Sequence, residues 1–201
     1  YDYPYLSSSA NHIFDITVGV GTNSNIYSTT TSQQSKKKNI YNQMAQVLMG
    51  YDATGSVLRF DEDGDILAGG TKIDDGFFLN FSRLLVKYEI KKGSFELELG
   101  VISAFAENGT VMAERVKITD ASGSDGYLVN SPVGEYGILY ATASVLNTDT
   151  LAANQSYAVG LLFYQAGVAF ISGSVFMDSS MFYTKEIILY FVDLSVKMKI
   201  H

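Results

Sequence analysis

Apolar and polar residues alternate along much of the chain, and this pattern predicts a protein built mainly from β-strands. The segment 94–102 shows the pattern best, because Glu96 and Glu98 alternate with apolar residues and so belong on the outward face. We expect strands, in chain order, at 13–20, 57–60, 76–81, 94–102, 112–118, 136–143, 157–164, 168–172 and 187–200. Such a set suits an antiparallel β-sandwich or open barrel with one or two short helices.

Turn signals separate these strands. Asn108-Gly109 is the strongest short hairpin signal, and Lys91–Ser94 and Gln165–Gly167 are expected to be further turns. The strands around Gln165–Gly167 belong to a stretch with almost no charge between Leu151 and Met177, so both faces of that hairpin should be covered. One cover would be the protein's own second sheet. The other would be either the helix described next or a neighbouring subunit.

The clearest helix is predicted over 37–49. Ser35 is its expected N-cap, and Gly50 stands where a helix-ending glycine is expected. A second helix is expected over 81–90. The apolar stripe of the first helix is formed by Ile40, Met44, Val47 and Leu48, and Tyr41 and Ala45 widen it.

Three lysines, Lys36-Lys37-Lys38, lie at the beginning of the predicted helix. A helix N-terminus favours acidic residues, so this cluster opposes the helix dipole. Two interpretations remain open. The lysines form either a solvated first turn or a contact for an acidic partner surface.

The first 35 residues differ from the rest in composition. Residues 1–12 are polar and aromatic, and 21–35 form a tract rich in Ser, Thr, Asn and Gln that is typical of a linker. We therefore divide the chain into an extended N-terminal arm and linker, 1–35, and a β-rich body, 36–201. Residues 1–20, with the strand at 13–20, should then pack against something other than this body.

Composition removes several kinds of chemistry. The chain has 201 residues, no cysteine and only two histidines, His12 and His201, so disulfides, thiolate sites and most histidine chemistry are excluded. Its net charge of −7 provides no basic footprint for nucleic acid, and no apolar run is long enough for a transmembrane helix. An outer-membrane barrel has similar composition, but residues 1–49 lack the evenly spaced strands that it needs.

The densest charged segment is Asp61-Glu62-Asp63-Gly64-Asp65. Its alternating Asp61, Asp63 and Asp65 resemble the beginning of a calcium loop, but Ile66 and Lys72 stand where that loop requires Gly and Glu. We therefore predict a solvated acidic turn with Gly64 at positive φ, which binds calcium weakly or not at all.

Other candidate constellations also lack the pattern that chemistry needs. Glu96 and Glu98 are expected to be solubilising, and a serine triad is improbable for the reason that no serine stands in a glycine elbow. The glycines form no phosphate-binding loop. We predict no catalytic, cofactor-binding or metal-binding residue, and no enzyme activity. The serines and glycines considered are Ser144, Ser156, Ser172, Gly19, Gly21, Gly69, Gly70 and Gly76.

Three segments, 37–48, 80–95 and 160–169, carry a resemblance to a known family. The second contains the phrase Phe-Ser-Arg followed by Lys and Ile and ending in Gly-Ser-Phe, and the third runs from Gly160 through Phe163-Tyr164 to Gly167-Val168. Together they resemble the virion structural proteins of large contractile-tailed bacteriophages, particularly marine ones. The resemblance implies a particle component and gives no residue a chemical role.

The leading hypothesis from the sequence is therefore a non-catalytic structural subunit of a phage particle, in its head, neck, tail or baseplate. Its partners would be other virion proteins and copies of itself, and it would be located in the virion as an oligomer. Exposed aromatic residues converging in a groove would instead favour a carbohydrate-binding β-sandwich adhesin module. An enzyme acting on polysaccharide would need two facing acids.

Overall fold

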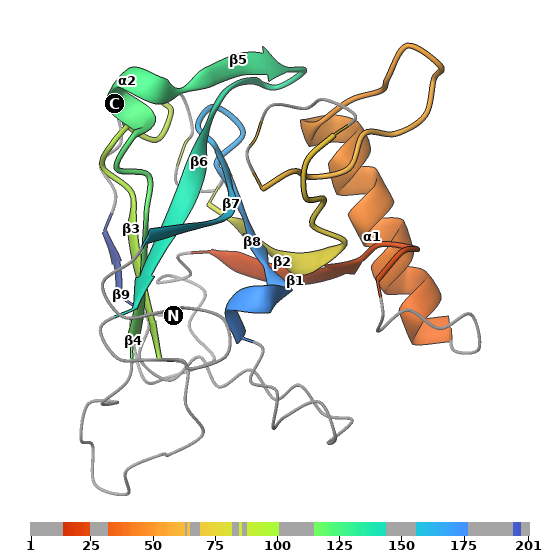
Figure 1. Cartoon of the computed structure of the whole chain (residues 1–201), viewed down its shortest axis with the longest axis horizontal. Helices are drawn as coiled ribbons and strands as arrows, with labels where there is room; N and C mark the ends of the chain where they lie inside the picture. Colours follow the sequence, from red (N-terminus) through yellow and green to blue (C-terminus); the bar gives the residue numbers. More distant parts are fainter. Residues whose placement is uncertain are drawn as a thin grey trace, which may run out of the picture.

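The protein forms one antiparallel sheet that is curled into a half-barrel (Figure 1). The computed structural model describes residues 14–24, 32–62, 64, 69–81, 85, 88–100, 115–143, 156–176 and 195–197. Within these residues the sheet has nine strands in the order β1-β2-β8-β7-β6-β4-β3-β9, with β5 paired to β6. The strands are β1 Asp15–Val20, β2 Asp75–Asn80, β3 Glu96–Gly100, β4 Arg115–Thr119, β5 Leu128–Ser131, β6 Gly134–Ala143, β7 Ser156–Phe163, β8 Val168–Ser172 and β9 Ser195–Lys197.

Helices are few in the part of the chain that the structure describes. The α-helices are α1 (Ser32–Leu48) and the short α2 (Gly123–Gly126), and a 3-10 turn, η2, spans Gly173–Phe176. The prediction of a mainly β fold is confirmed, with the half-barrel corresponding to the open-barrel form of that prediction.

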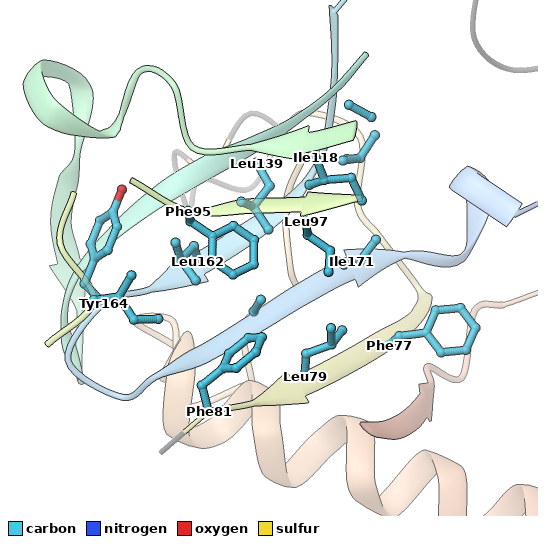
Figure 2. Packing of buried hydrophobic residues seen from close by; sticks show 14 of the residues in the cluster. Phe77, Leu79, Phe81, Phe95, Leu97, Ile118, Leu139, Leu162, Tyr164 and Ile171 are labelled. Carbon is cyan, nitrogen blue, oxygen red and sulfur yellow. The ribbon is translucent and has the colours of Figure 1, made fainter. Parts of the chain in front are cut away.

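The hairpin of β7 and β8 lies in the middle of the sheet, and both of its faces are buried. Leu162, Ala169 and Ile171 face the inside of the curl, where residues of β2, β3, β4 and β6 meet them (Figure 2). Leu161 and Phe170 face the other way, toward α1. The predicted helix cover is confirmed. The other cover is the curled continuation of the same sheet, because β3 and β4 bend over to face β2, and a separate second sheet was the wrong expectation.

Helix α1 was predicted correctly in its existence and its end, its buried face was predicted in part, and its beginning was predicted wrongly. It begins at Ser32, so Ser35 is inside the helix and not its N-cap. Gly50 has a φ of 83°, and its N–H bonds to the carbonyl of Ala45, 3.1 Å away, which closes the helix as expected. The buried stripe is formed by Tyr41, Ala45 and Leu48.

The exposed Val47 departs from the predicted stripe. Its side chain is 57% exposed, and Ile40 and Met44 lie only at the margin of the core. The reason is that Tyr41, at the edge of the predicted stripe, is its anchor: its hydroxyl donates to the carbonyl of Ile73 at 2.6 Å, and its ring packs against Phe60 and Phe170. This anchor turns the stripe toward Tyr41 and leaves Val47 on the outer side.

Strand β1 belongs to the body of the protein. It pairs with β2 along its whole length, from Asp15 opposite Asn80 to Val20 opposite Asp75, and α1 lies alongside it. The expectation that 13–20 pack against something else is therefore wrong for β1. A strand with a buried partner 60 residues later satisfies its backbone hydrogen bonds within the chain. Residues 1–13 and 25–31 of the predicted arm and linker lie outside the described residues.

Several local predictions have clear outcomes. The turns at Lys91–Ser94 and Gln165–Gly167 are confirmed, with φ of 72° at Gly93 and 64° at Gly167. The segment 57–60 forms no strand, only a bridge between Tyr51 and Val57. A continuous helix over 81–90 is also wrong, because the described residues of that range are not helical. The Asn108-Gly109 turn and most of the terminal strand around β9 lie outside the described residues.

Candidate functional site

The acidic segment that begins at Asp61 is anchored inside the protein at that residue. Asp61 is fully buried and forms a bridge with Lys72, whose ammonium pairs with its Oδ2. Its Oδ1 is buried without a hydrogen-bond partner in the described part of the chain. The prediction of a solvated turn is therefore wrong at Asp61. Lys72, which stands where a calcium loop requires Glu, pairs with the Asp61 carboxylate and so allows that carboxylate to be buried. Asp63 and Asp65 lie outside the described residues.

The neighbours of Asp61 hold this segment to β6 and to the residue directly before β2. Gly64 has a φ of 71°, as predicted, and its carbonyl accepts a hydrogen bond from the Tyr136 hydroxyl at 2.6 Å. The guanidinium of Arg59 lies 2.8 Å from Asp74. Burial, and then the charge of Arg59, lower the pKa of Lys72. The ammonium of Lys72 is nevertheless occupied by the Asp61 carboxylate, so this pair fixes the segment and offers no free nucleophile.

A second polar cluster lies at one end of the half-barrel, around Lys92 in the turn before β3. Its ammonium is 2.6 Å from Glu135 and 3.3 Å from Glu89, and it lies over the rings of Tyr127 and Tyr164. The hydrogen bond to Glu135 raises the pKa of Lys92 against the opposing effect of burial. Lys92 therefore stays charged and binds three segments of the chain together.

Asp120, directly after β4, is the buried centre of the same end. Its two oxygens accept the N–H groups of Gly93 and Phe95, each at 2.8 Å. Burial raises the pKa of Asp120, and the two N–H groups partly counter this effect. The Tyr164 hydroxyl lies beside the carboxylate, and burial followed by the charge of Asp120 raises the pKa of this phenol.

Glycines make room for the Tyr164 hydroxyl. A Cβ added to either Gly123 or Gly137 would overlap the phenol oxygen. The end of the half-barrel thus closes around one buried carboxylate, which accepts main-chain N–H groups, and one buried phenol, whose hydroxyl has no hydrogen-bond partner among the described residues (Figure 2 shows the ring of Tyr164). This arrangement stabilises the turn between β3 and the preceding segment.

The remaining sequence candidates are not brought together. Glu96 pairs with Lys117 at 2.7 Å across β3 and β4, and Ser172 is buried with its Oγ 2.8 Å from that of Ser174. His12 and Ser144 lie outside the described residues. Among the described residues, no three His, Cys, Asp or Glu side chains gather closely enough to hold a metal ion.

Sequence reasoning overlooked Asp120, Lys92 and Tyr164. A weak signal was present for Asp120, since an acid directly after a strand and before Ala-Ser-Gly is typical of a turn in which the carboxylate accepts backbone N–H groups. No local pattern indicates that Lys92 and Tyr164 meet it, because they come from separate turns.

Comparison with known proteins adds no relative: no family model, curated protein or solved structure matches this chain. In the residues that the structure describes, no helix is long and apolar enough to cross a membrane.

Proposed function

We propose that this chain is a non-catalytic structural subunit of a contractile-tailed bacteriophage particle, which acts through contacts with other virion proteins and with copies of itself. The observation that carries the proposal is the resemblance of 37–48, 80–95 and 160–169 to such proteins. These three segments contain most of α1, the connection from β2 to β3 and the β7–β8 hairpin. They contribute residues to the core clusters on both faces of the central hairpin, so the resemblance involves the core of the fold and not only a surface segment.

The polar clusters support the same proposal. Asp61 is engaged by Lys72, and Asp120 by the N–H groups of Gly93 and Phe95. Both carboxylates serve the fold, which suits a protein that works as a rigid building block.

The test is mass spectrometry of phage particles purified by density gradient from the source that encodes the chain. The chain should be present in a fixed ratio to the major virion proteins, and it should resist removal by a salt wash. Its absence from purified particles, with abundance in the soluble lysate, would overturn the proposal.

A carbohydrate-binding module is the second candidate, and one observation favours it. The ring of Tyr127 is 40% exposed beside the charged groups of Lys92 and Glu135, and exposed rings with adjacent polar groups are suited to sugars. Most other described aromatic rings are buried in the two core clusters. Binding to a glycan array that Tyr127→Ala abolishes would favour this candidate, and no binding above background would exclude it.

A further inference from the structure

Helix α1 is basic in an acidic protein. Its 17 residues include Lys36, Lys37 and Lys38 but no Asp or Glu. The chain as a whole carries 21 acidic residues against 14 basic ones. Lys36 and Lys37 are exposed and form no ion pair within the described residues. The helix therefore lacks the Glu–Lys pairs that commonly stabilise a solvent-facing helix, and two of its positive charges are available to a partner.

The outward side of α1 carries three exposed residues in line. Lys36, Gln43 and Val47 follow one another at seven and then four residues, so they lie on one side of the helix, opposite the buried Tyr41 and Leu48. Eleven residues separate the first from the last, which is about 16 Å along the axis. Val47 is 57% exposed, and Tyr51, just after the helix, is exposed to the same degree.

The loop after α1 ends this surface with a negative charge. Residues 51–56 are exposed throughout, and Asp52 lies among them. The Oδ1 atom of Asp52 accepts the N–H groups of Thr54 at 2.8 Å and Ser56 at 2.9 Å, as well as the Thr54 hydroxyl. These hydrogen bonds, that of the Thr54 side chain first, lower the pKa of Asp52, so it is ionised at neutral pH. The surface thus has a positive end, an apolar part and a negative end.

We propose that this surface, formed by Lys36, Gln43, Val47, Tyr51 and Asp52 and called the α1 face below, binds the α1 face of a second copy of the chain with the two helices antiparallel. In a two-fold symmetric contact every pairing occurs twice: if residue i of the first copy contacts residue j of the second, then residue j of the first copy contacts residue i of the second. Lys36 lies near the beginning of α1 and Asp52 in the loop that follows its last residue, Leu48, so the two charges are at opposite ends of the α1 face and antiparallel pairing brings each lysine toward the acid of the other copy.

Antiparallel pairing also brings the apolar side chains of Val47 and Tyr51 into the contact, where they are removed from water. Parallel pairing would place the lysines of the two copies against each other, so the charges select the antiparallel form. The inference rests on the proposed function for its setting, since it names one of the self-contacts through which an assembly subunit would act.

The test uses the isolated full chain in sedimentation equilibrium. We expect a reversible dimer whose dissociation constant rises with salt, because exposed charges at its two ends are screened. Lys36→Glu should weaken the dimer by roughly tenfold or more, since it places two acids opposite each other at both ends. Lys91→Glu is the matched control, because it makes the same charge change at another exposed lysine. Circular dichroism and thermal melting verify that both variants are folded.

Asp52→Asn sharpens the test, because the amide oxygen can still accept the loop N–H groups while the charge is removed. It should weaken the wild-type dimer, but in the Lys36→Glu background it should strengthen the dimer by relieving repulsion. A wild-type chain that stays monomeric at its highest soluble concentration overturns the inference. So do equal effects of Lys36→Glu and Lys91→Glu, or simply additive effects of Lys36→Glu and Asp52→Asn.

These results are separable from those for the proposed function. A chain that is found in purified particles but is monomeric in isolation overturns the α1 face contact alone. A salt-sensitive dimer of a chain that is absent from particles overturns the proposed function alone.

Discussion

Asp61 and Asp120 are both fully buried carboxylates, yet the protein accommodates them in different ways. Asp120 receives two backbone N–H groups, one on each oxygen, and faces the Tyr164 phenol. Asp61 is neutralised by a single side chain, Lys72, and one of its oxygens has no partner among the described residues. Backbone donors belong to the fold and cannot be deleted by substitution, whereas the partner of Asp61 can.

The comparison separates two uses of a buried charge. Asp120 acts as a local template, because it fixes the turn around Gly93 from inside. Asp61 acts as one half of a clamp between two segments, and removal of either half leaves an unpaired group in the core. The central β7–β8 hairpin differs from both sites, because its buried side chains pack among the apolar residues of the two core clusters.

Leu162→Asp should have the largest effect, because it adds to the hairpin a carboxylate with neither a lysine nor a backbone donor prepared for it. Leu162 is fully buried in the inner core. The cost should be on the order of 5 kcal/mol or more, which is comparable with the whole stability of a domain. The variant should lose its cooperative thermal transition. Val129→Asp, at a position that is 67% exposed on β5, is the control and should melt as the wild type does.

Lys72→Met should come next, because it leaves the Asp61 carboxylate buried and unpaired. We expect a loss of about 3–5 kcal/mol in the free energy of unfolding, measured with urea. Addition of Asp61→Asn to this variant should recover part of the loss. Lys92→Met is the control at the Asp120 end of the half-barrel. The acids that pair with Lys92, Glu89 and Glu135, are partly exposed, so its loss should cost only about 1 kcal/mol. Equal losses for the two lysine variants would show that Asp61 is not held by a clamp.

Asp120→Ala should cost about 2–3 kcal/mol, because the N–H groups of Gly93 and Phe95 lose their acceptor. Hydrogen exchange should locate the change, with faster exchange at these two amides and unchanged exchange in β7 and β8. Asp125→Ala, five residues after Asp120 and exposed on α2, should stay within about 0.5 kcal/mol of the wild type. Unchanged exchange at Phe95 in Asp120→Ala would contradict the template role.

How well the sequence predicts these features depends on how far apart along the chain the contacting residues lie. The β7–β8 hairpin and the end of α1 were predictable, because Gly167 and Gly50 act on their immediate neighbours. The burial of Asp61 was not, since it depends on Lys72 eleven residues away across an irregular loop.

Longer separations explain the other errors. The place of β1 depends on pairing with β2, which begins 55 residues after β1 ends. The site around Asp120 joins turns that begin near Lys92 and Tyr164, and only the completed curl of the sheet brings them together.

Gly137→Ala should disturb the Asp120 region through Tyr164, because the added methyl group would overlap the phenol oxygen. We expect a loss of roughly 1–3 kcal/mol in the free energy of unfolding. In a Tyr164→Phe background the same substitution should cost clearly less, since the overlapping atom is gone. A double-mutant cycle measures this coupling. If the two substitutions are additive, the glycines are not what makes room for the phenol.

The smallest effect should be the pH dependence of the free energy of unfolding, which reports the protonation of Asp120. Burial raises the pKa of Asp120 above its usual 3.8, so in the folded state this carboxyl holds its proton more strongly than in the unfolded chain. Its contribution to stability is therefore complete below 3.8 and is lost as the pH rises through the raised value. Wild-type stability should fall across this window more steeply than that of Asp120→Asn, because the amide does not titrate. Parallel curves of unfolding free energy against pH would mean that the two backbone N–H groups fully offset the burial of this carboxylate.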